Sequence, residues 1–171
     1  MQSFIRVVNH VNRAVGVFAA LLVVAAVAVT CQMIFMRYLL NASTVWQTEA
    51  VIYMMLGATM LGMGYVQQLK GHVNVDLVPI LLRPAARKIL LMVAAIASVM
   101  VVGVMTFYGW EMMHIAWTRN WTSDTVNAVP LWIPYSVMPL GFGLFMLQLI
   151  ADALETLQTP AEEIELSGSG H

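Results

Sequence analysis

The sequence predicts an all-α integral membrane protein with four transmembrane helices. Its composition is 60% hydrophobic and 10% charged, whereas a soluble domain carries about 25% charged residues. The apolar residues gather in long runs that hold almost no charge. Each run reaches the ~20 residues that an α-helix needs to cross about 30 Å of hydrocarbon. The runs cover residues 14–36, 50–69, 89–110 and 129–151.

One membrane domain is expected over residues 1–155, followed by an acidic tail over residues 156–166. The last residues, 167–171, read SGSGH, which is typical of a vector-derived linker, and no structural role is expected for them. The first apolar run is longer than the roughly 7–15 residues of a cleaved signal peptide. It continues into Arg37 without a small-residue cleavage site, so we expect a retained helix.

Basic residues predict the orientation of the spans, because Lys and Arg are retained on the cytoplasmic side. With both termini inside, the cytoplasmic basic residues are Arg6, Arg13, Lys70, Arg83, Arg87 and Lys88. Only Arg37 and Arg119 then lie outside. We therefore expect both termini in the cytoplasm.

The first thirteen residues are amphipathic. Phe4, Val8 and Val11 fall on one helical face, with Arg6 and Arg13 on another. We expect a short helix lying in the cytoplasmic membrane interface. The alternative is that this segment extends the first span.

A second interfacial helix is expected between the second and third spans. Gly71 is a helix stop after the second span, Asp76 is placed to cap a new helix, and Pro79 falls in its first turn. Pro84 then suits the first turn of the third span. The basic residues that can reach lipid phosphates from this segment are Arg83, Arg87 and Lys88.

Ionisable residues are absent from the middle of every span, although a transporter that binds its own substrate normally has them there. Cys31 is the single cysteine, which excludes an intramolecular disulfide. The histidines lie at or beyond the span ends, which disfavours haem, and Glu111 with His114 makes a poor metal site. We expect no enzyme activity, no cofactor, no metal and no nucleic-acid binding.

The outer boundary of the predicted bundle holds most of the candidate functional residues. All five tryptophans cluster there, Trp46 and Trp132 among them, and either anchor the chain at the lipid headgroups or form a docking surface for an external protein. Arg37 and Glu49 lie at the same depth, and we expect a structural ion pair between them. The charged residues that would belong to a docking surface are Glu111, Arg119 and Asp124.

Several short motifs connect these observations to a known family. Arg37 precedes the sequence WQTE at residues 46–49, and GHVNVD follows the second span at residues 71–76. The last span opens with PLWIPY at residues 130–135 and continues with PLG at residues 139–141. With these motifs, residues 1–155 resemble the small, DctQ-type membrane subunit of tripartite ATP-independent periplasmic (TRAP) transporters.

The resemblance implies a non-enzymatic permease subunit of the bacterial inner membrane. In that family, a separate large membrane subunit moves the substrate by an elevator motion coupled to a sodium gradient. A periplasmic binding protein delivers a carboxylate-bearing substrate, and the small subunit braces the large one and helps the binding protein to dock. The resemblance carries over Arg37, Trp46, Glu49, His72 and Asp76 as structural positions.

Two other hypotheses stay open at this point. The first is a self-sufficient small transporter that works as an oligomer, which requires a charged residue inside a span. The second is a redox or haem membrane enzyme, which an absorbance spectrum would identify. Phospholipids are expected partners under every hypothesis.

Overall fold

The structure is a computed structural model that describes residues 2–69, 84–125 and 127–158. The described residues form four helices, which are α1 (Gln2–Leu39), α2 (Val45–Gln68), α4 (Pro84–Thr118) and α5 (Trp132–Gln158). All four are long and apolar enough to cross a membrane, which confirms the predicted fold class.

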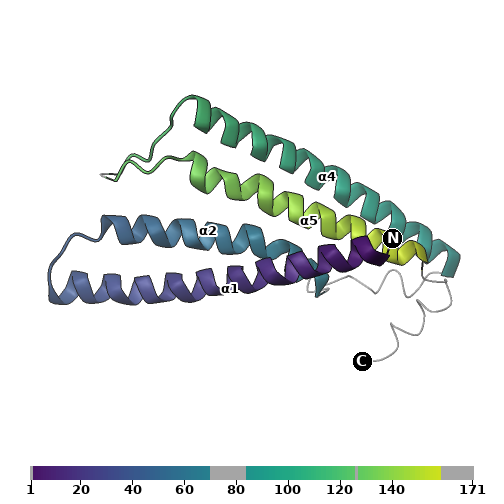
Figure 1. Ribbon diagram of the computed structural model, residues 1–171, viewed down its shortest axis with the longest axis horizontal. Coiled ribbons are helices and arrows are strands. Elements are labelled where there is room, and N and C mark those ends of the chain that lie inside the picture. The colour runs from purple at the N-terminus through teal and green to yellow at the C-terminus, as the bar shows by residue number, and fades with distance from the viewer. Residues whose placement is uncertain (1, 70–83, 126, 159–171) are drawn as a thin grey trace.

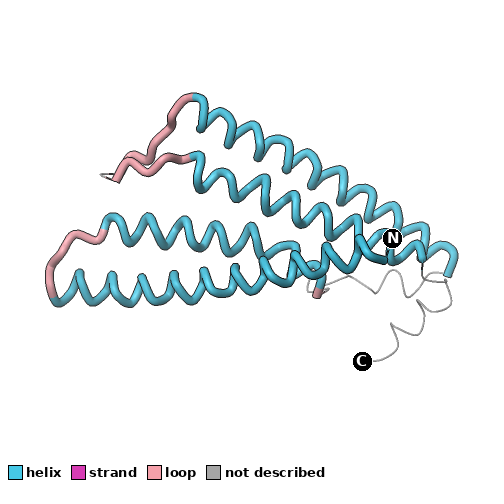
Figure 2. Tube along the Cα trace, viewed as in Figure 1, coloured by secondary structure: helices cyan, strands magenta, loops and turns pink. Residues whose placement is uncertain are grey.

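The helices form two hairpins, α1–α2 and α4–α5 (Figure 2). Their connections, residues 40–44 and 119–131, lie at the same end of the molecule, which we call the loop end (Figure 1). The N-terminus and the last turns of α5 lie at the opposite end, which we call the terminal end. Helix α5 contacts α1, α2 and α4, so it is the central element, whereas α4 packs mainly on α5 and lies at the edge of the bundle.

Helix α1 is a single continuous helix, so the expected separate N-terminal helix is wrong and the alternative, an extension of the first span, is correct. At 1.5 Å per residue its length is about 57 Å, well beyond the hydrocarbon thickness. No glycine or proline separates residues 2–13 from the span. Val8 and Asn12 are buried, so this segment gains contacts within the bundle instead of lying flat on lipid.

Two helices end at an asparagine in the left-handed backbone region, which asparagine tolerates better than most residues. Asn41 follows α1 and Asn120 follows α4, each with φ of 48°. After α4, the Trp121 N–H bonds to the Ala116 carbonyl at 3.0 Å, which is the pattern of a Schellman motif. Helix α4 begins at Pro84, as the sequence predicted.

Small residues set the separation between α1 and α2. A Cβ at Gly16 would collide with the ring of Tyr65, and one at Gly62 would lie 3.7 Å from Ala19 Cβ. Close backbone approach is a main source of helix association in lipid, where no hydrophobic force drives helices together. The glycines of the first two spans therefore serve packing within the chain.

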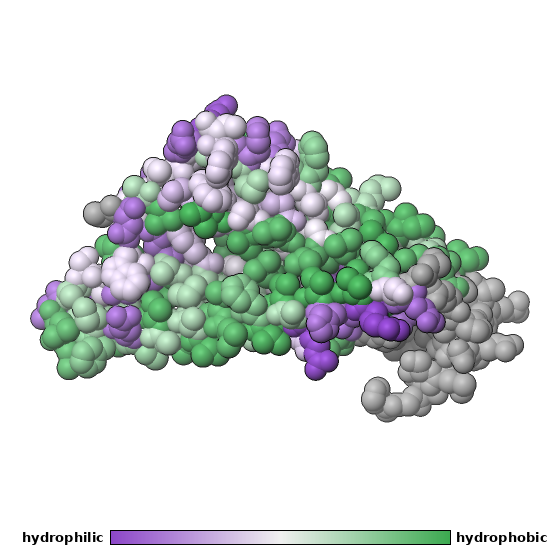
Figure 3. Space-filling model, in the orientation of Figure 1, coloured by the Kyte–Doolittle hydropathy of each residue, from purple (hydrophilic) through white to green (hydrophobic). Residues whose placement is uncertain are grey.

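The core is thin and the surface is apolar. The buried hydrophobic side chains are mostly alanine, whereas many larger apolar side chains are exposed along all four helices. In the view of Figure 3, a hydrophobic surface extends between hydrophilic residues at the loop end of α4 and others near the N-terminal turns of α1. Helix α4 is the least buried of the four. This distribution fits a chain surrounded by lipid or by another membrane protein.

Candidate functional site

A chain of hydrogen bonds joins three helices at the terminal end. Asn12 Nδ2 donates to Gln148 Oε1 at 2.7 Å, and Gln148 Nε2 donates to Asn9 Oδ1 at 3.0 Å and to Asp152 Oδ1 at 2.9 Å. Gln67 Nε2 donates to the other carboxylate oxygen, Asp152 Oδ2, at 2.9 Å. We call these five residues the terminal cluster. It ties α1 and α2 to α5.

Burial makes the terminal cluster a strong constraint. Asn12 is 1% exposed and Gln148 is 2% exposed. A buried polar group without a partner costs roughly 1–3 kcal/mol. Gly64 is the place where α2 admits the Asn12 side chain, because a Cβ there would collide with Asn12 Oδ1. Loss of the Asn12–Gln148 bond would therefore leave two buried amide groups without that partner.

A second polar cluster lies at the loop end. Tyr53 donates to Glu49 Oε1 at 2.7 Å, and Thr125 donates to Glu49 Oε2 at 2.7 Å. The hydroxyls of Ser123 and Thr125 also lie 3.0 Å apart. We call these four residues the loop-end cluster. It connects the first turns of α2 with the α4–α5 connection, although Glu49 and Thr125 are 76 residues apart.

The α4–α5 connection has a defined conformation of its own. Leu131 N–H bonds to the Trp121 carbonyl and Ser123 N–H to the Val129 carbonyl, both at 2.9 Å, which forms an isolated bridge between Thr122 and Pro130. Ala128 lies in the left-handed region with φ of 45°. The connection is thus a short folded loop that presents Thr125 to α2.

The expected ion pair between Arg37 and Glu49 is wrong. Arg37 is exposed in the last turn of α1, and the described residues contain no ion pair between the two side chains. Glu49 is 7% exposed, and its oxygens instead accept bonds from Tyr53 and Thr125. The two residues do share the loop end, but they face different surroundings.

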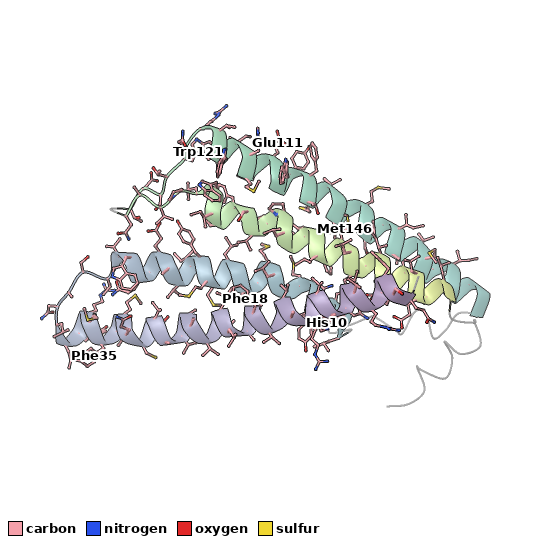
Figure 4. All side chains as sticks on the ribbon, in the orientation of Figure 1. His10, Phe18, Phe35, Glu111, Trp121 and Met146 are labelled. Atoms are coloured by element: carbon pink, nitrogen blue, oxygen red, sulfur yellow. The ribbon has the colours of Figure 1, made fainter. Side chains whose placement is uncertain are left out.

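The other predicted candidates divide by location. Glu111, Arg119 and Asp124 are exposed at the loop end, and Figure 4 shows Glu111 near Trp121 there. His72 and Asp76, together with the expected second interfacial helix up to residue 83, lie outside the described residues. The three charged candidates are thus exposed at the same end of the molecule.

The tryptophans all lie at the loop end, as the sequence predicted. Trp46 stands in the first turn of α2 and is 49% exposed. Trp132 opens α5 and packs edge-to-face on Trp117, with ring centroids 4.7 Å apart. The Trp117–Trp132 contact therefore joins the ends of α4 and α5 next to the folded connection.

Two threonine hydroxyls within the spans bond to their own helices. Thr30 donates to the Ala26 carbonyl at 2.7 Å and Thr59 to the Met55 carbonyl at 2.8 Å. Such bonds use up the hydroxyl proton within the helix. These mid-depth side chains therefore have no free donor to offer to a substrate.

An open apolar groove lies between α4 and α5, with a volume of about 610 Å³. Met146 on α5 and Gly103 on α4 line it, and Figure 4 shows Met146 beside α4. Its two hydroxyl groups, on Thr106 and Ser136, both donate to backbone carbonyls of their own helices. The groove thus presents no unpaired hydroxyl donor and suits an apolar occupant.

The terminal cluster is not among the contacts predicted from the sequence. Gln148 lies inside the fourth apolar run, and Asp152 follows directly after that run. A usable signal was present, because Asn9 with Asn12 and Gln148 with Asp152 have the i,i+3 and i,i+4 spacings that place side chains on one helix face. Polar pairs on one face near a span end indicate an interhelical contact.

Comparison with known proteins identifies a family and a relative. Residues 26–159 match the family described as tripartite ATP-independent periplasmic transporters, DctQ component. The chain is also 24% identical over 146 residues to the C4-dicarboxylate TRAP transporter small permease protein DctQ of Vibrio cholerae. That alignment covers 72% of this chain and 62% of the relative.

Proposed function

The chain belongs to the DctQ component family of tripartite ATP-independent periplasmic (TRAP) transporters, and on this premise we propose that it braces a separate large permease subunit and helps a periplasmic binding protein to dock. The large subunit moves an organic acid by sodium symport, and this chain binds no substrate itself. The Vibrio cholerae relative is named for C4-dicarboxylate transport, which supports a carboxylate as the substrate class.

The observation that supports the bracing role is that the polar groups of the bundle form hydrogen bonds with one another. The terminal cluster and the loop-end cluster lie near opposite ends, and their bonds run between segments of this chain. Thr30 and Thr59 bond to their own helices at mid-depth. A hydrophilic cargo needs polar or charged groups directed at it within the membrane. This arrangement supports a static element beside a moving one.

We place both termini in the cytoplasm of the bacterium and the loop end in the periplasm, because the basic residues favour that orientation. The exposed residues of the loop end are then in position to meet a soluble binding protein. An alkaline phosphatase fusion after Gln158 should be inactive, whereas one inserted at Asp124 should be active. The reverse pattern would rule out docking at the loop end.

The main test is reconstitution in proteoliposomes. The purified chain alone should give no uptake of organic acids, and uptake should require the large subunit, the binding protein and a sodium gradient together. Omission of this chain should abolish or strongly reduce uptake. Flux through vesicles that contain only this chain would instead establish a self-sufficient transporter.

Docking is tested by charge reversal at the loop end. We expect Glu111→Lys, Arg119→Glu and Asp124→Lys to weaken uptake while the chain still co-purifies with the large subunit. Gln2→Glu is a suitable control, because it alters charge at an exposed position of the terminal end. Unchanged uptake for all three reversals would assign those residues to the solvated loop surface.

A further inference from the structure

We infer that Glu49 is a positioning residue that holds the α4–α5 connection in the conformation required for docking. This inference rests on the proposed docking function of the loop end. Glu49 lies in α2, far in sequence from the connection, yet one of its oxygens accepts a 2.7 Å bond from Thr125. The contact therefore sets where the folded connection sits relative to the α1–α2 hairpin.

Burial of the carboxylate makes this contact specific. Glu49 is 7% exposed, and a buried carboxylate is costly unless each oxygen has a donor. Tyr53 serves one oxygen from the next turn of α2, and Thr125 serves the other from the connection. Because Tyr53 belongs to the same helix, departure of the connection would take away the donor from the second oxygen.

The position of the contact makes it a bridge between the two hairpins. Figure 1 shows α4 and α2 well apart at the loop end, with the connection reaching from the α4–α5 hairpin toward the start of α2. The bonds within the connection fix its shape, since Ser123 N–H and Leu131 N–H pair across the Thr122–Pro130 bridge. The bond between Thr125 and Glu49 fixes where the connection lies relative to α2.

The residues carried by the connection are those that a soluble partner would meet. Asp124, which precedes Thr125, and Asn127 are exposed, and Arg119 is exposed at the start of the connection. Thr125 itself is partly buried against Glu49. A side chain that faces inward thus determines the position of side chains that face outward.

The first experiment measures uptake in the complete reconstituted transporter as a function of binding-protein concentration. We expect Thr125→Val and Glu49→Met to raise the half-saturating concentration about three- to tenfold with little change in the maximal rate, because the net loss of one hydrogen bond has an effect of that order. Glu49→Gln should retain much of the wild-type value, because its amide can accept from Tyr53 and donate to Thr125. Thr48→Val is the matched control, since the Thr48 hydroxyl bonds to the Thr44 carbonyl and to Met33 Sδ, neither of which belongs to the α4–α5 connection.

The second experiment reads the connection directly and needs no partner. A spin label is attached at Asp124→Cys in a Cys31→Ser background, and its mobility is measured in the chain reconstituted alone. Thr125→Val should increase the label's mobility, whereas Thr48→Val should leave it unchanged. Equal mobility in both variants would overturn the inference.

The two experiments separate failure of this inference from failure of the proposed function. If uptake did not depend on this chain at all, the proposed function would fail, and with it the docking part of the inference. If uptake depended on the chain but Thr125→Val matched Thr48→Val in half-saturating concentration, only the positioning role of Glu49 would be overturned.

Discussion

Asn12 in α1 donates a 2.7 Å hydrogen bond to Gln148 in α5, across 136 residues of sequence, and both side chains are almost completely buried. The bond joins the first and last helices of the bundle, which otherwise have a smaller interface than α1 with α2. Gln148 also donates to Asn9 and to Asp152, so its single amide group connects two α1 residues, Asn9 and Asn12, with the Asp152 carboxylate. Gln148 is therefore the central residue of the terminal cluster.

Replacement of Gln148 should be the most damaging single change in the terminal cluster. Gln148→Leu removes the acceptor for Asn12 and the donor to Asn9 and Asp152. Interhelical hydrogen bonds in membrane proteins contribute about 0.6 kcal/mol on average and up to about 1.7, so we expect the free energy of unfolding to fall by about 1–3 kcal/mol. The measurement is an SDS titration of the protein in mixed micelles, in which unfolding is followed by the circular dichroism signal of the helices.

The control for that change is Gln32→Leu, which replaces an exposed glutamine in α1. It should leave the unfolding free energy unchanged or increase it slightly, because the new side chain faces lipid. Equal effects of the two substitutions would show that the terminal cluster adds no net stability.

Asp152 should be needed as a carboxylate and not only as a polar side chain. Its two oxygens each accept a bond from an amide, one from Gln67 and one from Gln148. Asp152→Asn places an NH₂ group where one of these donors points, so one bond is lost and two donors face each other. We expect a loss of about 1–2 kcal/mol in the same SDS titration.

Two comparisons test this account of Asp152. Asp124→Asn removes the charge of an exposed residue of the connection and should have no effect on stability. The double variant Asp152→Ala with Gln67→Leu should cost less than the sum of the two single variants, because each single variant already removes the Gln67–Asp152 bond. Strict additivity would mean that the Gln67–Asp152 contact contributes nothing.

The Trp117–Trp132 contact should stabilise the loop end of the α4–α5 hairpin. The rings meet edge-to-face with centroids 4.7 Å apart, a geometry worth about 0.5–1.5 kcal/mol beyond the area that it buries. Trp132→Leu should therefore lower the thermal unfolding midpoint in detergent, and Trp132→Phe should retain most of the stability. Trp110→Leu, at a residue that is 58% exposed, is the control. Equal midpoints for Trp132→Leu and Trp110→Leu would refute the contact's role.

Much of the fold follows from features that are local in sequence. The length of an apolar run is enough to predict a span, and Pro84 marks a helix start because a proline costs little in the first turn. The indoles concentrate at one end because the chain reverses between spans, which returns every second boundary to the same side. None of these predictions needs to know which helix lies next to which.

The polar contacts could not be predicted in the same way, because the sequence alone does not show which element packs on each face of a helix. Arg37 and Glu49 share a depth, but depth alone does not choose a partner, and the Glu49 oxygens bond to Tyr53 and Thr125 instead. The Thr125 contact further depends on a connection in which Ala128 adopts a positive φ that alanine rarely takes. Likewise, periodicity placed Val8 on a face of a helix, but only the position of α5 reveals that this face is buried.

The packing of α2 against α5 near Met60 should depend on Gly141. A Cβ at this position would lie 2.5 Å from the Met60 carbonyl oxygen, which belongs to the backbone and cannot move aside as a flexible side chain could. Gly141→Ala should therefore force the two helices apart and cost about 1–3 kcal/mol, the usual range for overpacking.

Gly143→Ala is a matched control in the same helix, because nothing lies within 4 Å of its Cβ position. It should be neutral or slightly stabilising, since alanine is the better helix former. Measured side by side in the SDS titration, a Gly141→Ala protein as stable as Gly143→Ala would show that α2 and α5 are not in contact at Met60.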